Sequence, residues 1–292
     1  MTTRFGLFGT GYWAAETQGP ALLAHPDVEF VGVWGRNPAK AARLADRFGA
    51  RPYDDVDALI ADVDAIAVSL PPDVQAGIAE RAARAGKDLL LDKPLALDLT
   101  AADRVVGAVE DSGVASTIFF TNRFQPSING FLDDAAAEVG WHGSRILMFG
   151  SIFRPDSPYK DSAWREVHGG LWDIGPHALS VTAPVLGPVD EVAAMAGPRS
   201  TTHLLLRHAG GAVSTFSLTL DAPQELFRLE LFGEPGTRLV PDRGDPAAAA
   251  FGRAIDHLLA RGEGLGVHFG REVVAVLTAA ETAYREGRTV TL

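Results

Sequence analysis

The fold is decided by one stretch, RFGLFGTGYWA, which covers residues 4–14. It predicts a short buried strand that runs into the pattern Gly9-x-Gly11-x-x-Ala14 and then into a helix. In such a turn the first glycine permits a tight bend, the second lets backbone approach a pyrophosphate, and the small third residue lets helix and strand pack closely. The helix N-terminus then offers N–H donors to an anion. The alternative is an ordinary tight turn that binds no nucleotide. The predicted cofactor contacts in this turn are Gly9, Thr10, Gly11, Tyr12 and Trp13.

Composition narrows the class of protein. The chain has 292 residues, of which 47% are hydrophobic, enough for one or two buried cores. No apolar run approaches the roughly 20 residues of a membrane span, and no export signal is visible at the first residues. Cysteine is absent, which excludes disulfides, thiolate chemistry and cysteine zinc sites, and the net charge of −11 argues against nucleic acid. We therefore expect a cytoplasmic protein with neither a nucleic-acid nor a membrane partner.

Strands and helices alternate through the first 120 residues. The expected strands after the first are Glu29–Trp34, Val63–Leu70, Lys87–Leu91 and Ala115–Phe120. The expected helices between them are Pro38–Phe48, Asp73–Ala85 and Leu99–Glu110. This alternation predicts an α/β fold with a doubly wound parallel (Rossmann) sheet, whose ligands lie beyond the carboxyl ends of the strands. Gly9, Gly35, Ser69, Lys93 and Asn122 all fall at such ends.

The end of the second strand bears on cofactor choice. A dinucleotide fold usually places an acid there to bind the ribose 2′-hydroxyl, and this chain has Gly35 followed by Arg36. Glycine leaves room for a phosphate and a guanidinium binds one bidentately, so we expect NADP, with NAD as the second possibility. The alternative is that Arg36 is a solvated loop residue or stacks on adenine. The further predicted cofactor contacts are Gly35, Arg36, Asn37, Ser69, Leu70, Pro71, Asp92 and Lys93.

Lys93 lies between a strand end and a proline, in the sequence Asp92-Lys93-Pro94. A stiff backbone at this place would hold its amine near a bound nicotinamide, as a proton shuttle or a hydrogen-bond donor to a substrate hydroxyl. The alternative is a surface lysine that pairs with Asp92 or Asp98.

The second half of the chain predicts a different architecture. The expected strands are Ser144–Phe153, Val192–Ala196, Thr202–His208, Ala212–Leu220 and Leu226–Phe232, and a two-residue connection at Gly210-Gly211 would join two of them. Expected helices are Ser127–Glu138, Pro176–Leu186, Ala247–Ala260 and Gly270–Glu286, with a last strand at Thr289–Leu292. We predict a dinucleotide-binding domain over residues 1–122 and an α+β domain with an open, mainly antiparallel sheet over residues 123–292, the C-terminal helices packing back on the body. One face of such a sheet needs cover, which favours a homodimer or homotetramer.

Residues 164–177, WREVHGGLWDIGPH, hold the second candidate site. Asp173 and His177 are four residues apart with a helix start between them, so carboxylate and imidazole can act on one substrate. Histidine exchanges protons near neutral pH. Two alternatives are an N-capping aspartate with a packed histidine, and a zinc site that includes His168 but has no third ligand at convincing spacing; we expect no metal.

Several stretches together resemble the Gfo/Idh/MocA family of oxidoreductases, which includes glucose–fructose oxidoreductase and inositol dehydrogenase. The likeness rests on residues 9–14, on the segment from Pro71-Pro72 to Gly86-Lys87, on Asp92-Lys93-Pro94, and on residues 169–177. Trp164-Arg165 and the ending Gly287–Val290 also resemble the family. The one departure within these motifs is Asp92, which replaces the family's glutamate and keeps its charge.

The resemblance implies a Rossmann domain and an oligomerising sheet domain. It implies that Lys93 lies beside nicotinamide and substrate, that Asp173 binds substrate and that His177 is the acid/base. We expect hydride transfer between NAD(P), with NADP preferred, and a carbinol or carbonyl of a sugar, cyclitol or polyol. Two other functions fit the same motifs, an NAD-dependent glycoside hydrolase with tightly held cofactor and a catalytically silent NADP-binding regulator. The predicted substrate contacts are Asn122, Arg123, Trp164, Arg165, His168, Asp173 and His177, and the predicted catalytic residues are Lys93, Asp173 and His177.

Overall fold

The computed structural model describes residues 2–292, which pack into two compact units. The first unit comprises the chain up to Phe124 together with Asp245–Glu272. The second comprises Gln125–Gly244 and Val273–Leu292. Each unit has its own sheet and is described by itself.

The first unit is built on a six-stranded sheet in which every pair of neighbours is parallel. Its strands are β1 (Thr3–Phe8), β2 (Val28–Trp34), β3 (Arg51–Tyr53), β4 (Ala65–Val68), β5 (Asp88–Asp92) and β6 (Ser116–Phe119). The order is β3-β2-β1-β4-β5-β6, so the direction of winding reverses between β1 and β4. A reversal of this kind leaves a crevice at the carboxyl ends of the two central strands, where dinucleotides bind in doubly wound folds. The predicted fold class is confirmed.

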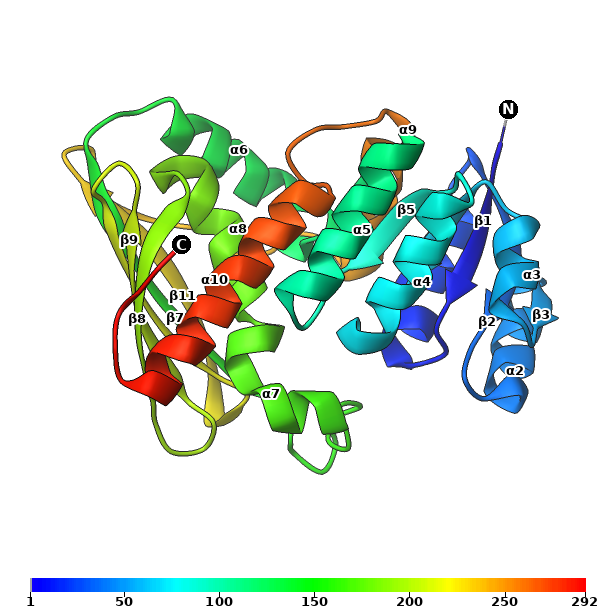
Figure 1. Ribbon diagram of the computed structural model, residues 1–292, viewed down its shortest axis with the longest axis horizontal. Coiled ribbons are helices and arrows are strands. Elements are labelled where there is room, and N and C mark those ends of the chain that lie inside the picture. Colours follow the sequence, from blue (N-terminus) through cyan, green and yellow to red (C-terminus); the bar gives the residue numbers. More distant parts are fainter. Residues whose placement is uncertain (1) are drawn as a thin grey trace. The chain divides into compact units, whose positions relative to one another are not determined.

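Helices follow the strands in the order that the alternation predicts. They are the π-helix η1 (Ala14–Gln18), α1 (Gly19–Ala24), α2 (Pro38–Phe48), α3 (Val56–Ala61), α4 (Pro72–Arg84), α5 (Leu99–Ser112), the short 3₁₀-helix η2 (Thr121–Phe124) and α9 (Ala247–Leu259). Helices α4 and α5 lie side by side (Figure 1). Helix α9 packs against α1, η1 and β6. Apolar side chains of β1, β4 and β5 are fully buried between these layers, as a parallel sheet covered on both faces requires.

The boundaries of α2 follow directly from its sequence. The Asn37 side chain accepts a hydrogen bond from the backbone N–H of Lys40 at 3.1 Å, Pro38 is the first helical residue, and Gly49 ends the helix at φ 66°. These are the usual N-cap and C-cap residues of an α-helix.

Three elements of this unit, β3, α3 and the short η2, were not predicted from the sequence. The signal for α3 is present, because the Asp55 side chain accepts a hydrogen bond from Ala58 N–H at 2.8 Å and so caps the helix. The three residues of β3 are too short for a visible alternation of apolar and polar side chains.

The second unit holds a seven-stranded sheet of order β12-β11-β7-β10-β9-β8-β13. Its strands are β7 (Trp141–Ser151), β8 (Val189–Ala196), β9 (Thr202–His208), β10 (Val213–Thr219), β11 (Asp221–Gly233), β12 (Gly236–Leu239) and β13 (Val290–Thr291). All neighbouring strands are antiparallel except β7 and β10. The predicted mainly antiparallel sheet is therefore confirmed, with one parallel pair inside it.

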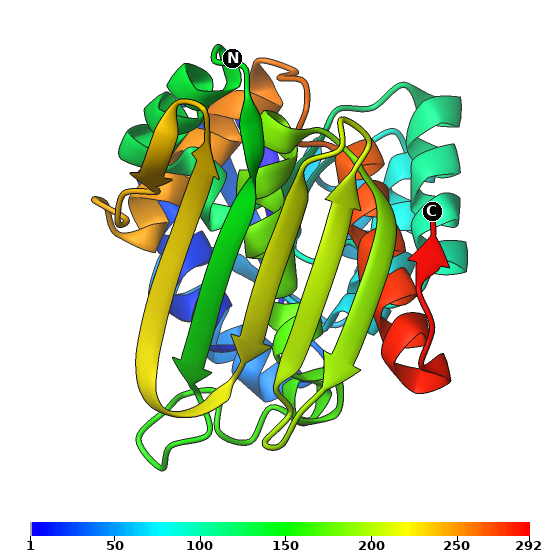
Figure 2. The ribbon, with the colours of Figure 1, turned by 90° about the vertical axis from the view of Figure 1, so that its left-hand side faces the viewer.

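One face of this sheet is covered by helices and the other carries none, as Figure 2 shows. The helices are α6 (Pro126–Ala136), α7 (Ala163–Asp173), α8 (Gly175–Leu186) and α10 (Val267–Glu286), which begins in the first unit. In β9 burial alternates strictly: Leu204 and Leu206 are buried, whereas Leu205 is exposed. Alternation of this kind marks a strand with one covered face.

The connection between β9 and β10 differs from the prediction. It contains three residues, Ala209–Gly211, because His208 N–H donates to Ala212 O at 2.9 Å. Gly211 has φ 87°, the left-handed conformation that a three-residue hairpin needs at its last position.

Among residues 2–292, no helix combines the length and the apolar character that crossing a membrane requires.

Candidate functional site: a dinucleotide turn and an aspartate–histidine segment

The turn after β1 is fixed by contacts with both neighbouring strands. Gly9 N–H donates to Trp34 O at 2.8 Å, and Ser69 N–H donates to Phe8 O at 2.8 Å. A Cβ on Gly9 would lie 2.2 Å from the Ser69 carbonyl oxygen, and its φ of 137° is one that only glycine adopts readily. The ends of β1, β2 and β4 thus converge on this glycine.

Gly11, in contrast to Gly9, has no close neighbours. It is exposed, and a Cβ added there would meet nothing within 4 Å. The fold therefore does not require glycine at this place, whereas close approach of a phosphate to the backbone does. Trp13, next in the same turn, has a buried Nε1 that finds no hydrogen-bond partner among the described residues. An open backbone approach and an orphaned donor are features that a bound dinucleotide would use, so the residues present fit an NAD(P) cofactor.

The sequence predicted a helix after the turn, and the structure has one, but it does not begin as a regular α-helix. Residues Ala14–Gln18 form a π-helix, closed by a hydrogen bond from Gly19 N–H to Ala14 O. A Cβ on Gly19 would lie 2.3 Å from the Phe48 ring, so glycine permits α2 to pack here. Gln18, fully buried, donates from its amide to Val68 O at 3.0 Å and ties this helix to the end of β4.

The end of β2 carries the residues expected to select the cofactor. Gly35 is buried, and a Cβ on it would lie 2.5 Å from Cγ2 of Thr10. Arg36 and Asn37 are exposed. Glycine at position 35 therefore has a packing reason as well as a cofactor reason, a fact that the sequence did not reveal.

Lys93 lies in a turn held by a glutamine from another element. The Asp92 side chain accepts a hydrogen bond from Lys93 N–H at 2.8 Å, and the Lys93–Pro94 peptide is cis. Gln75, in the first turn of α4, hydrogen bonds to the backbone of Asp92, Pro94 and Leu95. The turn is thus anchored on both sides of Lys93.

The remaining predicted residues of the first unit also follow strands. Ser69, Leu70 and Pro71 come directly after β4 and are half-buried. Asn122, which is buried, and Arg123 lie in η2, directly after β6. Because all the strands of this sheet are parallel, these segments share the sheet edge that carries the dinucleotide turn.

In the second unit Arg165 and Asp173 form an ion pair. Arg165 Nε lies 3.0 Å from Asp173 Oδ2, and both side chains are largely buried. The guanidinium carbon lies 4.6 Å from the ring centroids of both Tyr159 and Trp164, so two aromatic rings hold it in cation–π contact. Two of the predicted substrate contacts, Trp164 and Arg165, are thereby brought together with Asp173.

Asp173 ends α7 and His177 lies in the first turn of α8. The N-cap position of α8 is Ile174, which makes no side-chain cap, so Asp173 is not the N-cap residue. Asp173 and His177 are both 7% exposed.

His168 packs its ring edgewise on Trp172, with ring centroids 6.0 Å apart. Among residues 2–292 no group of three or more His, Asp or Glu side chains is arranged to hold a metal ion.

The double glycine before Asp173 lets α7 approach the sheet. Gly169 has φ 61° and kinks the helix, and a Cβ on Gly170 would lie 2.9 Å from Thr219 Cα. Larger residues at these two positions would push Asp173 away from the end of β10.

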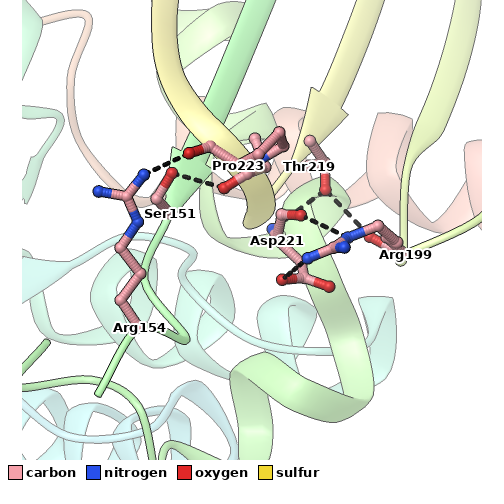
Figure 3. Close-up of polar contacts among 7 residues, drawn as sticks. Ser151, Arg154, Arg199, Thr219, Asp221 and Pro223 are labelled. Atoms are coloured by element: carbon pink, nitrogen blue, oxygen red, sulfur yellow. Dashed lines mark hydrogen bonds and ion pairs between the residues drawn. The ribbon is translucent and has the colours of Figure 1, made fainter. Parts of the chain in front are cut away.

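The segments around this glycine pair are fixed by polar contacts (Figure 3). Arg199 donates to the Asp221 carbonyl oxygen at 2.9 Å and to its carboxylate at 2.8 Å, and Thr219 Oγ1 donates to Arg199 O at 3.0 Å. On the neighbouring side Ser151 donates to Ala222 O at 2.7 Å, and Arg154 donates to Pro223 O. Hydrogen bonds therefore hold the corner between β10 and β11, close to the place where α7 packs against β10.

Two residues that support the site, Gln75 and Tyr159, were not predicted from the sequence. Each acts on a residue at least six positions away in the sequence, on Asp92 and on Arg165, and neither lies in a recognisable motif. The burial of Gln75 in the first turn of α4 is visible only in the structure.

Two family comparisons cover most of the chain. Residues 3–120 match the family described as "Oxidoreductase family, NAD-binding Rossmann fold", and residues 141–238 match the "GFO/IDH/MocA C-terminal domain". The chain is 31% identical over 253 residues to dTDP-3,4-didehydro-2,6-dideoxy-alpha-D-glucose 3-reductase of Streptomyces antibioticus, covering 82% of this chain and 75% of the relative. It is 28% identical over 254 residues to inositol 2-dehydrogenase of Rhizobium meliloti (strain 1021), covering 81% of this chain and 74% of the relative.

Among solved structures, GenD2 from gentamicin A biosynthesis in complex with NAD has the same fold. The TM-score is 0.88 at 22% identity, over 100% of this chain and 96% of that one. Fold, motifs and relatives agree, and the chain belongs to the Gfo/Idh/MocA family of NAD-binding oxidoreductases.

Proposed function

We propose that this protein is an NADP-preferring oxidoreductase that transfers a hydride between nicotinamide C4 and the carbinol carbon of a sugar, cyclitol or related polyol. The observation that carries the cofactor part is the contrast in the dinucleotide turn: Gly9 is required by packing, whereas Gly11 faces open space. The substrate class is supported by the two relatives, which are named as a sugar-nucleotide reductase and an inositol dehydrogenase.

In the proposed mechanism the protein moves one proton and stabilises one charge. The nicotinamide, when bound, accepts or donates the hydride. During oxidation the substrate hydroxyl loses its proton as the C–H bond breaks, and His177 takes that proton. The ammonium of Lys93 stabilises the negative charge that develops on the oxygen. In the reverse direction His177 returns the proton.

Asp173 and Arg165 bind rather than react in this proposal. An ionised carboxylate accepts hydrogen bonds only, so Asp173 suits the hydroxyls of a polyol. Arg165 fixes the carboxylate by its 3.0 Å contact and is itself fixed by Tyr159 and Trp164. Asn122, Arg123 and His168 are proposed as further contacts to hydroxyls.

The first experiment is a spectrophotometric screen of the purified protein. NADP⁺ or NAD⁺ is paired with sugars, inositols and sugar acids, and NADPH or NADH with keto-sugars. Lys93→Ala and His177→Ala should each lower turnover at least about a hundredfold, because each removes a group that acts in the transition state. Near-normal turnover in a folded variant removes that residue from the mechanism. No turnover in the whole panel, with cofactor binding verified separately, supports a hydrolase or a silent regulator instead.

NADP preference is supported by Arg36, an exposed cation directly after the β2 end, and by the lack of a carboxylate there. Its test must take account of Thr10, because a side chain at position 35 would collide with Cγ2 of Thr10. We expect the triple variant Thr10→Ser, Gly35→Asp, Arg36→Ser to shift the ratio of NADPH to NADH affinity toward NADH, by at least about tenfold. Thr10→Ser alone is the control and should leave the ratio unchanged. An unchanged ratio in the triple variant means that the 2′ group is recognised elsewhere.

A further inference from the structure

Gln75 makes an unusual set of contacts for a helical side chain. It lies in α4 and is 1% exposed. Its amide nitrogen lies 2.7 Å from Asp92 O, 3.0 Å from Pro94 O and 3.4 Å from Leu95 O, and donates to these carbonyls. Its amide oxygen accepts from Asp92 N–H at 2.9 Å. One side chain therefore binds the backbone immediately before and immediately after Lys93.

These contacts take the place of β-sheet hydrogen bonds that β4 does not make to Asp92. The pairing of β4 with β5 ends at Ala67 and Leu90, because the chain then leaves β4 for the two prolines at positions 71 and 72. Beyond this point the backbone of Asp92 has no strand beside it on the β4 side. The Gln75 amide, with one donor side and one acceptor, pairs with Asp92 as a peptide group of a neighbouring strand would.

We propose that Gln75 is the positioning residue of Lys93: it holds the Asp92–Leu95 backbone so that the Lys93 amine stays where hydride transfer needs it. The proposal rests on the proposed function, in which Lys93 stabilises charge on the substrate oxygen. Displacement of a catalytic group by about 1 Å is enough to cost about a hundredfold in rate. A turn whose buried carbonyl groups lack a donor rearranges to find water, and Lys93 moves with it.

Gln75→Glu offers a variant of nearly identical shape with a proton-dependent donor. As a carboxylate it keeps the acceptor for Asp92 N–H but faces the Asp92 and Pro94 carbonyls with an oxygen that cannot donate. As a carboxylic acid it regains one donor and one acceptor. Burial among carbonyl oxygens raises the pKa of such a glutamic acid, so lowering the pH toward 6 should restore the amide-like form. Gln75→Met has a similar volume and no such recovery.

The first arm of the test does not depend on activity. Hydrogen–deuterium exchange of the peptide that spans residues 88–97 is measured at pH 8 and pH 6, corrected for intrinsic exchange. We expect lost protection at both pH values in Gln75→Met, and lost protection at pH 8 that is regained at pH 6 in Gln75→Glu. Gln18→Glu is the matched control, because Gln18 is equally buried and also donates to a strand-end carbonyl, that of Val68. It should not alter exchange in residues 88–97.

The second arm uses turnover. Gln75→Glu should lower kcat at least about tenfold at pH 8 with little change in KM for the cofactor, and kcat relative to wild type should recover at pH 6. In a Lys93→Ala background the same substitution should add less than about twofold, because a positioning residue acts only through Lys93. An equal loss in both backgrounds, or unchanged exchange in Gln75→Met, overturns the proposal. If Lys93→Ala alone turns over normally, the mechanism proposed for Lys93 fails, and the exchange data still decide whether Gln75 holds the turn.

Discussion

Gly9 and Gly11 stand two residues apart in one turn and are glycines for different physical reasons. Gly9 carries a φ of 137°, and a Cβ there would collide with the Ser69 carbonyl oxygen. Gly11 has no strained φ, and a methyl group added there would meet no neighbour within 4 Å. The packing of the fold therefore requires the first glycine but not the second, and we propose that Gly11 leaves room for a bound phosphate.

Alanine at each position separates the two roles. Gly9→Ala should lower the free energy of unfolding by about 3 kcal/mol, the scale of steric overpacking combined with an unfavourable φ. Gly11→Ala should leave stability within about 0.5 kcal/mol of wild type and weaken NADPH binding at least about tenfold, because the methyl takes the space of a phosphate. Urea denaturation and a fluorescence titration with NADPH measure the two effects. Unweakened binding in Gly11→Ala would remove the pyrophosphate from this position.

At the scale of elements, a buried polar chain links the covered face of the second sheet to the end of α8. His208, fully buried on β9, donates from Nδ1 to Gly187 O at 2.8 Å, and its Nε2 accepts from Ser214 Oγ at 2.8 Å. Ser144 Oγ in turn donates to Ser214 Oγ at 2.7 Å and joins β7 to the chain. Burial lowers the pKa of His208 below its ordinary value of 6.5, although the Gly187 carbonyl opposes the shift.

This pKa makes stability depend on pH in a defined direction. As the pH falls below about 6.5 the unfolded chain takes up the proton before the folded chain does, so the free energy of unfolding decreases until the pH reaches the folded-state pKa. Each unit of pKa difference contributes about 1.4 kcal/mol. We expect His208→Gln to remove this part of the decrease between pH 7.5 and pH 5. Urea unfolding at several pH values measures it, and parallel pH profiles for the two proteins would contradict the assignment.

Elements specified by local chemistry could be predicted from the sequence. Helix α2 is an example, because Asn37, Pro38 and Gly49 mark its two ends within the segment itself. Strand β9 is another, since the run Thr202–His208 predicted from the sequence has the observed bounds. Contacts between distant segments were not predictable, among them the parallel pairing of β7 with β10.

The residues of the candidate site also fall into those that could be predicted from the sequence and those that could not. The dinucleotide turn and the motif residues Lys93, Asp173 and His177 are visible in the sequence. Gln75, which binds the backbone around Lys93, and Tyr159, which contacts the Arg165 guanidinium, depend on tertiary packing that no local pattern encodes.

At the scale of the whole molecule, we propose that the face of the second sheet that carries no helix (Figure 2) is a surface for self-association. Leu205 is 50% exposed and Met195 is 74% exposed on β9 and β8, and Leu226 is 40% exposed on β11. Burial of such side chains against a second copy removes apolar surface from water, which favours a dimer or tetramer.

Leu205→Asp should convert such an oligomer to a monomer, because a carboxylate in the middle of an apolar interface loses its hydration. Size-exclusion chromatography with light scattering measures the mass. Leu23→Asp, an equally drastic change at an exposed leucine of α1 in the first unit, is the control and should leave the mass unchanged. A wild-type protein that is already monomeric at micromolar concentration would contradict the proposal.

The π-helix at Ala14–Gln18 has a consequence for how this chain aligns with its relatives. A π-helical turn holds one residue more than an α-helical turn, as if a single amino acid had been inserted into a regular helix. Loss of one residue between Ala14 and Gly19 would close an ordinary turn and keep the rest of α1 in phase with the sheet. Family members without the extra residue should therefore show a one-residue gap inside a helix, a place where insertions and deletions are otherwise rare.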